Sequence, residues 1–378
     1  MVSVRYNFVN CILSIGVYWL MDKQNVISAI NVDVIRVVAI FAVILLHVNN
    51  VFTQSVSDIG FLRWWIVVDI YQIIGKLGVP FFIMLSGALL LAPSKLDEDI
   101  GTFFKKRFTR IGIPFIFWGV IFFLWGLYVE NQPATQEFFI NGLLKGPYPT
   151  FWYLYMLCGL YFITPLLRVM VAHFTDKLFK YFICVWFLGA AVLSLIEFLS
   201  GYQTSLEALV FLIPLCVGYF VIGAYLVKVQ IRRWILFSLT VLGFALTAIA
   251  TYLIDGSSSG SDTAFFFQGN NSPPMILATL ALFILINSYA KPKSTAKIEK
   301  TSWTQRIIHV ISENTLPIYL LHMIFVYALK HGFFGFVLTG STIDPIISVP
   351  LTATITLILC LLIIIPLKKI PKLKQLIG

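Results

Sequence analysis

Charged residues are scarce in this chain. Only 12% of its 378 residues are Asp, Glu, Lys or Arg, whereas 59% are hydrophobic and the mean hydropathy is +0.90. Repeated apolar runs of about 18 residues or more are typical of membrane-spanning helices. The composition therefore excludes a soluble domain and predicts an all-α, polytopic membrane bundle of about ten transmembrane helices. We expect the spans at 34–53, 65–91, 111–129, 150–170, 179–199, 208–227, 235–254, 273–290, 312–330 and 346–366.

Cysteine is also sparse. The chain has five cysteines, each alone in an apolar stretch: Cys11, Cys158, Cys184, Cys216 and Cys360. No two of them have the spacing of a disulfide framework or a metal site. We therefore expect packing residues, no metal site and no tightly bound cofactor.

Basic residues exceed acidic ones, 27 to 17, but they are not spread evenly. If the N-terminus is inside, most of them fall in alternate loops and in the tail. This asymmetry satisfies the positive-inside rule and predicts that both termini are cytoplasmic. The basic character thus reflects topology and contact with membrane lipids, and nucleic-acid binding is not expected.

The ends of the chain differ from its membrane-spanning part. The apolar run at 8–20 is too short to span a membrane, and no small-residue cleavage site follows it. Residues 1–30 are therefore expected to be an over-extended start or an interfacial segment. We expect one transmembrane domain over 31–370 and a basic cytoplasmic tail at 371–378.

The first predicted span carries an arginine and a histidine eleven residues apart, Arg36 and His47. Eleven α-helical steps return His47 to within about 20° of Arg36 and about 16 Å further along the axis. Ionisable side chains inside a membrane are costly and usually face a protein interior or a wet cavity. Asp33 lies one turn before Arg36 and could hold it. A functional face is therefore predicted, with an inner-interface arginine and a packing histidine as the alternative.

A second candidate lies where the chain enters the third span. Arg107 and Arg110 form an i, i+3 pair that an α-helix would present on one side. Guanidinium groups match phosphate oxygens with parallel hydrogen bonds, so the pair suits an anion. The alternative is that both arginines only anchor the inner membrane surface.

Three further groups of residues could support a site. Asp69 and Lys76, seven residues apart in the second span, could neutralise each other or line an acceptor path. Trp152 lies at the outer end of the fourth span. Tyr319 and His322 lie in the ninth span, where His322 could share a cavity with His47 or be a hydrogen-bonded packing residue.

The motifs that these residues form, and the order of those motifs along the chain, resemble those of acyltransferase family 3. This is a family of integral membrane O-acyltransferases. The resemblance covers about residues 30 to 330. It rests on Asp33-x-x-Arg36 with His47, on Arg107-x-x-Arg110, and on three shorter blocks: Val79-Pro80-Phe81-Phe82 through Ser86-Gly87, Trp152-Tyr153-Leu154, and Ile318-Tyr319-Leu320-Leu321-His322. Two positions depart from the family pattern, Thr150 where many members have His and Pro317 where Gly is usual.

The resemblance implies transfer of an acyl group, commonly acetyl, from cytoplasmic acyl-CoA to a hydroxyl of a cell-surface or lipid-linked glycan. It implies that Arg36, Arg107 and Arg110 hold the CoA phosphates and that His47 is catalytic, either as a base or as an acyl carrier. It also implies the bacterial cytoplasmic membrane as the location. The chain is expected to be the stand-alone form, without the hydrolase domain that some members carry.

The alternative function is a transporter or flippase of lipid-linked saccharides. Such a protein also needs many spans, buried charges and a cavity, but it would move its substrate without consuming a thioester. A membrane scaffold without chemistry is the third possibility, and the ionisable residues inside the spans argue against it.

Overall fold

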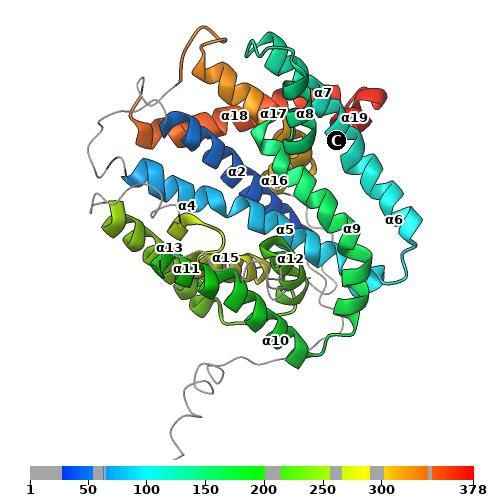
Figure 1. The fold of residues 1–378 in the computed structure, drawn as a ribbon, viewed down its shortest axis with the longest axis vertical. Coiled ribbons are helices and arrows are strands. Elements are labelled where there is room, and N and C mark those ends of the chain that lie inside the picture. Colours follow the sequence, from blue (N-terminus) through cyan, green and yellow to red (C-terminus); the bar gives the residue numbers. More distant parts are fainter. Residues whose placement is uncertain are drawn as a thin grey trace, which may run out of the picture. The chain divides into compact units, whose positions relative to one another are not determined.

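The computed structural model describes residues 28–53, Arg63, 65–200, 214–255, 266–289, 302–338 and 343–378. Most of the predicted N-terminal segment 1–30 and residues 208–213 of the predicted span 208–227 lie outside these ranges. Helices make up the described part, which contains no β-strand (Figure 1). The predicted all-α membrane architecture is confirmed.

Eight stretches of the described chain are long and apolar enough to cross a membrane. Each coincides with a predicted span, although three of them begin seven or more residues earlier than predicted, at Ile100, Gln136 and Phe266. The stretches are Asn31–Thr53, Ile66–Leu90, Ile100–Tyr128, Gln136–Ala172, Asp176–Ile196, Arg233–Leu253, Phe266–Asn287 and Pro345–Leu367.

The other two predicted spans look different. Span 312–330 falls on α16 (Trp303–Glu313) and α17 (Thr315–Lys330), which are bent by 78° to each other. Pro317 explains the bend, because a proline cannot donate to the carbonyl four residues earlier and clashes with it. That carbonyl, on Glu313, accepts a hydrogen bond from Lys368 instead, at 3.4 Å. Span 208–227 falls on the short helix α12 (Leu215–Leu226), so the count of ten stays a prediction.

The chain divides into two compact units, each built from separate segments. The first contains Met1–Ile35, Pro80–Leu89 and Thr175–Gln305, and the second contains Arg36–Val79, Leu90–Phe174 and Arg306–Gly378. All but one of the predicted site residues belong to the second unit; Asp33 belongs to the first. The single transmembrane domain over 31–370 stays a prediction.

The first unit contains the C-terminal part of α5 (Gly78–Leu90) and the helices that follow residue 175. Glycines let α5 and α12 approach closely: a Cβ on Gly87 would overlap the carbonyl oxygen of Phe220, and one on Gly223 would overlap that of Met84. Close backbone approach through small residues is how membrane helices gain packing energy. The remaining helices of this unit are α10 (Asp176–Phe187), η5 (Leu188–Leu193), α11 (Ser194–Ser200), α13 (Arg233–Asp255) and α15 (Pro273–Asn287).

The second unit holds most of α2 (Ala29–Thr53), which packs closely against the segment containing α4. A Cβ on Gly75 would lie 2.7 Å from the Cβ of Leu46, and one on Gly78 would lie 2.7 Å from the carbonyl oxygen of Ala39. The other elements of this unit are η1 (Ile66–Ile70), α4 (Tyr71–Lys76), η2 (Pro93–Lys95), α6 (Ile100–Arg107), η3 (Phe108–Gly112), α7 (Ile113–Tyr128), α8 (Gln136–Lys145), η4 (Pro149–Phe151), α9 (Trp152–Ala172), α16, α17, α18 (Pro345–Leu367) and α19 (Pro371–Ile377).

α18 packs beside α17 in an antiparallel arrangement (Figure 1). Pro350 interrupts its hydrogen bonding, since it has no N–H for the carbonyl of Ile346. The hydroxyl of Tyr71 donates to that carbonyl at 2.5 Å and so replaces the missing bond. Within a membrane such a replacement matters, because no water is present to satisfy the carbonyl.

The C-terminal residues 371–378 do not extend away from the fold. They form α19, which packs against α7, and Ile377 is buried there. Its carbonyl accepts a hydrogen bond from the indole of Trp118 at 3.4 Å. The tail is therefore basic, as predicted, but also helical and docked.

Candidate active site

His47 and His322 face each other inside the second unit. Their ring centroids are 5.2 Å apart, with the ring planes inclined by 44°. His47 comes from α2 and His322 from α17. The imidazole of His47 therefore points toward protein, and the structure brings together two histidines that the sequence only suggested might share a cavity.

The orientation of His322 is fixed by its own helix. Its Nδ1 lies 2.6 Å from the carbonyl oxygen of Tyr319. A carbonyl can only accept, so Nδ1 carries the hydrogen and, in the neutral ring, Nε2 carries the lone pair. His322 is fully buried, and its Nε2 has no partner among the described residues. For His47, likewise, no hydrogen bond joins either ring nitrogen to the described part of the chain.

The segment that contains Trp152 and Tyr153 packs against Tyr319, on the helix that carries His322. The hydroxyl of Tyr319 donates to the carbonyl of Thr150 at 2.6 Å, and the rings of Tyr319 and Tyr153 lie 5.2 Å apart. Trp152 contacts Tyr153 with centroids 6.2 Å apart, but 47% of its surface is exposed. Of this segment, Tyr153 rather than Trp152 lies against the histidine-bearing helix.

Lys76 and Asp69 are separated in the structure. Lys76 ends α4 and lies within electrostatic range of His47. Asp69 is buried in η1, a π-helical turn. Such a turn changes the angular register, so a spacing of seven residues no longer brings two side chains to one face. No ion pair between Asp69 and Lys76 is present among the described residues, and a role for either side chain along the acceptor path stays a prediction.

Arg107 and Arg110 lie at a helix irregularity, Arg107 just before it and Arg110 within it. Arg107 ends α6, and Arg110 lies in η3, another π-helical turn. The i, i+3 geometry of an α-helix therefore does not apply to them. Both guanidinium groups nevertheless lie within electrostatic range of the Tyr161 hydroxyl, so they converge on one region.

A buried ion pair underlies Arg107, and the sequence did not reveal it. The guanidinium of Arg168 donates to a carboxylate oxygen of Glu98 at 2.8 Å and to the carbonyl of Leu90 at 2.7 Å. The guanidinium carbon of Arg168 lies 4.6 Å from the centroid of the Phe103 ring. The guanidinium carbon of Arg107 lies 5.4 Å from the same centroid. Arg168 is buried within α9, where this carboxylate holds it.

Two lysines of the C-terminal region extend the cationic patch around Arg110. Burial lowers the pKa of Lys368; Glu313 opposes this shift, while Lys374 and Arg110 add to it by repulsion. Like charges gathered in this way are unfavourable unless an anion binds near them. From the sequence these lysines only satisfied the positive-inside rule.

Arg36 and Asp33 both lie on α2, so Arg36 shares one continuous α-helix with His47 as predicted. Both side chains are partly buried. The gathering of Arg36 with Arg107 and Arg110 stays a prediction.

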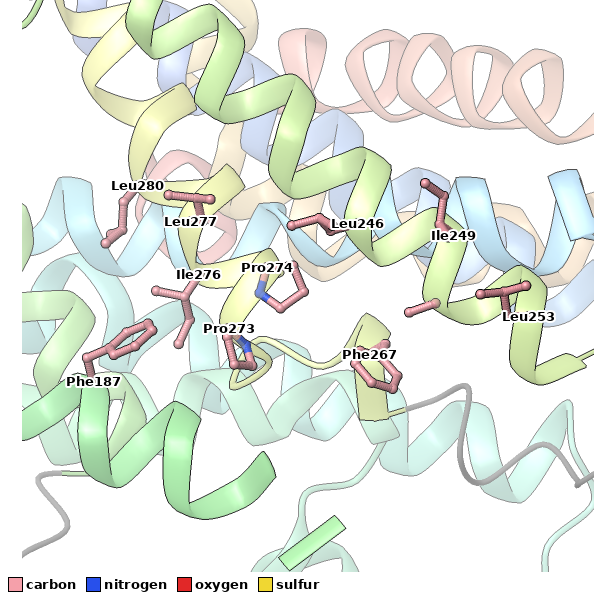
Figure 2. A pocket seen from close by; sticks show the side chains of 11 residues that line it. Phe187, Leu246, Ile249, Leu253, Phe267, Pro273, Pro274, Ile276, Leu277 and Leu280 are labelled. Atoms are coloured by element: carbon pink, nitrogen blue, oxygen red, sulfur yellow. The ribbon is translucent and has the colours of Figure 1, made fainter. Parts of the chain in front are cut away.

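A separate pocket of about 630 Å³ lies in the first unit. Figure 2 shows it lined by Leu246, Ile249 and Leu253 of α13 and by Pro273, Pro274, Ile276, Leu277 and Leu280 of α15, with Phe187 and Phe267 beside them. None of the lining side chains is titratable, so the pocket offers no group for acid–base chemistry. Within the described ranges, no cluster of three or more His, Cys, Asp or Glu residues is placed to hold a metal ion.

Comparison with known proteins gave one match. A family model described as an acyltransferase domain matches residues 30–365, which is nearly the whole chain. Searches of curated proteins and of solved structures found no match.

Proposed function

The chain belongs to acyltransferase family 3 and is a multi-pass membrane acyltransferase, and from this premise we propose that it moves an acyl group from acyl-CoA to a carbohydrate hydroxyl. The donor is acetyl-CoA in the first instance, and the acceptor is a cell-surface or lipid-linked glycan. The observation that carries the proposal is the pairing of His47 with the fully buried His322, with ring centroids 5.2 Å apart.

The reaction needs a base that removes one proton. The acceptor oxygen attacks the thioester carbonyl carbon, a C–O bond forms and the C–S bond breaks. His47 takes the hydroxyl proton and returns it to the departing sulfur, so that CoA leaves as the thiol. An imidazole with free ring nitrogens suits this role, and a positioned base contributes about 10² to 10⁴ in rate. His322 is held by Tyr319 and lies where it can position the His47 ring or the acceptor.

A relay is the second form of the same chemistry. His47 could itself attack the thioester, carry the acyl group on a ring nitrogen and then pass it to the acceptor oxygen. In both forms the products are an acyl ester and CoA. The depth of His47 along α2, about 16 Å beyond Arg36, suits delivery toward the outer side.

The arginines would bind the CoA end of the donor. Arg36, Arg107 and Arg110 are the proposed phosphate ligands, and the repulsion of Lys368 by Lys374 and Arg110 supports an anion there. CoA is made in the cytoplasm, so this patch would face it. The proposed location is the bacterial cytoplasmic membrane.

Replacing His47 by Ala tests the proposal. We expect CoA release from acetyl-CoA, measured with purified protein and a glycan acceptor, to fall by a factor of about 10² or more. His173→Ala is the matched control, because His173 is exposed and ends α9. Both variants should reach the membrane at the wild-type level.

Wild-type CoA release by His47→Ala would refute the mechanism. Movement of a lipid-linked saccharide across vesicles by the wild-type protein without CoA release would instead support the transporter alternative. The acetyl mass increment on the cell-surface polysaccharide should disappear in a deletion strain.

A further inference from the structure

Three hydroxyl groups on one face of α18 have no hydrogen-bond partner in the described part of the chain. Ser348, Thr352 and Thr356 follow one another at intervals of four residues, so they form a stripe about 12 Å long. All three are fully buried, and the described residues offer no partner to any of the hydroxyls. Buried polar groups are nearly always satisfied, most strictly in a membrane.

Other hydroxyls in the spans behave differently. Thr164, Thr240 and Thr247 each donate to the carbonyl four residues earlier in their own helix, at 2.7 to 3.0 Å. Thr354 does the same on α18 itself, donating to Pro350 at 2.8 Å. This bond is the usual way in which a helical Ser or Thr satisfies its hydroxyl. The stripe hydroxyls are therefore turned away from their own backbone and toward the interior.

The register of α17 and α18 places the stripe near the histidines. The two helices are antiparallel, and Lys368, just after α18, contacts Glu313, just before α17. His322 lies midway along α17 and Thr356 lies midway along α18, so antiparallel packing puts the two residues at a similar level. Thr356 is thus level with His322, whose Nε2 also lacks a partner among the described residues.

We infer that Ser348, Thr352 and Thr356 bind the acceptor and that this acceptor is a neutral, polyhydroxylated saccharide. The inference rests on the proposed function. Hydroxyl side chains both donate and accept, as sugar hydroxyls do. α18 carries no charged residue, and η1, with the buried Asp69, packs against it. Because α18 offers no charged side chain to pair with an ionised group, the stripe suits a neutral ligand.

The test removes the hydroxyls while keeping the shape of the side chains. Thr352→Val and Thr356→Val are compared with Thr354→Val, the matched control on the same helix. Alkyl glucoside, galactoside and rhamnoside serve as acceptors, with acetyl-CoA as donor. We expect each stripe variant to raise the KM for the glycoside by up to about tenfold, the value of one hydrogen bond. The KM for acetyl-CoA should stay the same, and Thr354→Val should behave as wild type.

Several results would overturn the inference. In one, wild-type protein releases CoA slowly from acetyl-CoA and no glycoside accelerates the release. In another, the stripe variants keep the wild-type KM for glycoside and melt at the same or a higher temperature, which means that the hydroxyls bind water only. A parallel rise in both KM values would show a general packing defect. A wild-type protein that never consumes acetyl-CoA would instead refute the proposed function.

Discussion

Glu98 shows how a single residue can order a cationic region. Its carboxylate accepts from Lys106 and from Arg168, both at 2.8 Å. The Arg168 side chain is only 3% exposed, whereas that of Lys106 is 55% exposed. The pair with Arg168 therefore contributes more to the free energy of unfolding than the pair with Lys106. Removing one partner of a buried pair leaves an uncompensated charge.

Glu98→Gln is expected to destabilise the protein by about 3 kcal/mol, because Arg168 stays buried without a counter-charge. Thermal unfolding in detergent measures the change. Asp97→Asn, at an exposed neighbouring position, is the control and should melt near the wild-type temperature. Equal melting temperatures for Glu98→Gln and wild type would contradict the prediction.

The effect of Glu98→Gln on the melting temperature is also expected to depend on pH. The hydrogen bonds from Lys106 and Arg168 lower the pKa of Glu98 below its ordinary value of 4.5, against the effect of burial. A lowered native pKa stabilises the fold fully above pH 4.5, and the stabilisation is lost as the pH falls through the native pKa. The gap in melting temperature between wild type and Glu98→Gln should therefore be constant near neutral pH and close in acid.

At the scale of the element, the packing of α2 against α4 determines where His47 lies. Gly75 lies against Leu46, the residue before His47, with no room for a methyl group. Any side chain at this position must push the two helices apart. The sequence shows glycines in this span, but it does not show which helix they contact.

Gly75→Ala is expected to lower the rate of acyl transfer by about tenfold to a hundredfold, because a displacement of about 1 Å at a reacting group has that effect. Gly119→Ala is the control, since its Cβ would meet nothing within 4 Å. CoA release measures the activity, and thermal unfolding separates displacement from misfolding. Equal activities of the two variants would argue against a precise placement of His47 by this contact.

At the scale of the whole molecule, the distribution of basic residues predicts the topology. A fluorescent protein fused after Gly378 should fluoresce, because the positive-inside rule places the C-terminus in the cytoplasm. Alkaline phosphatase fused after His331 should be active, since this position begins a predicted outer loop. The opposite pair of signals would reverse the orientation and would put the cationic patch at Arg110 and Lys368 on the side that lacks CoA.

The sequence by itself determined the membrane class, the positions of the helices and the placement of Arg36 and His47 on one helix. These properties depend on local hydropathy and on the helical repeat, which a sequence displays directly. It did not show the π-helical turns at Asp69 and Arg110, which alter the expected faces.

Only the tertiary structure decided which distant side chains meet. It set His47 against His322 and buried Arg168 on Glu98, and it left the α18 hydroxyls without a partner among the described residues. These outcomes depend on how helices cross and in which register they pack. Neighbouring apolar helices have nearly the same hydropathy, so the sequence pattern does not specify which of them are in contact.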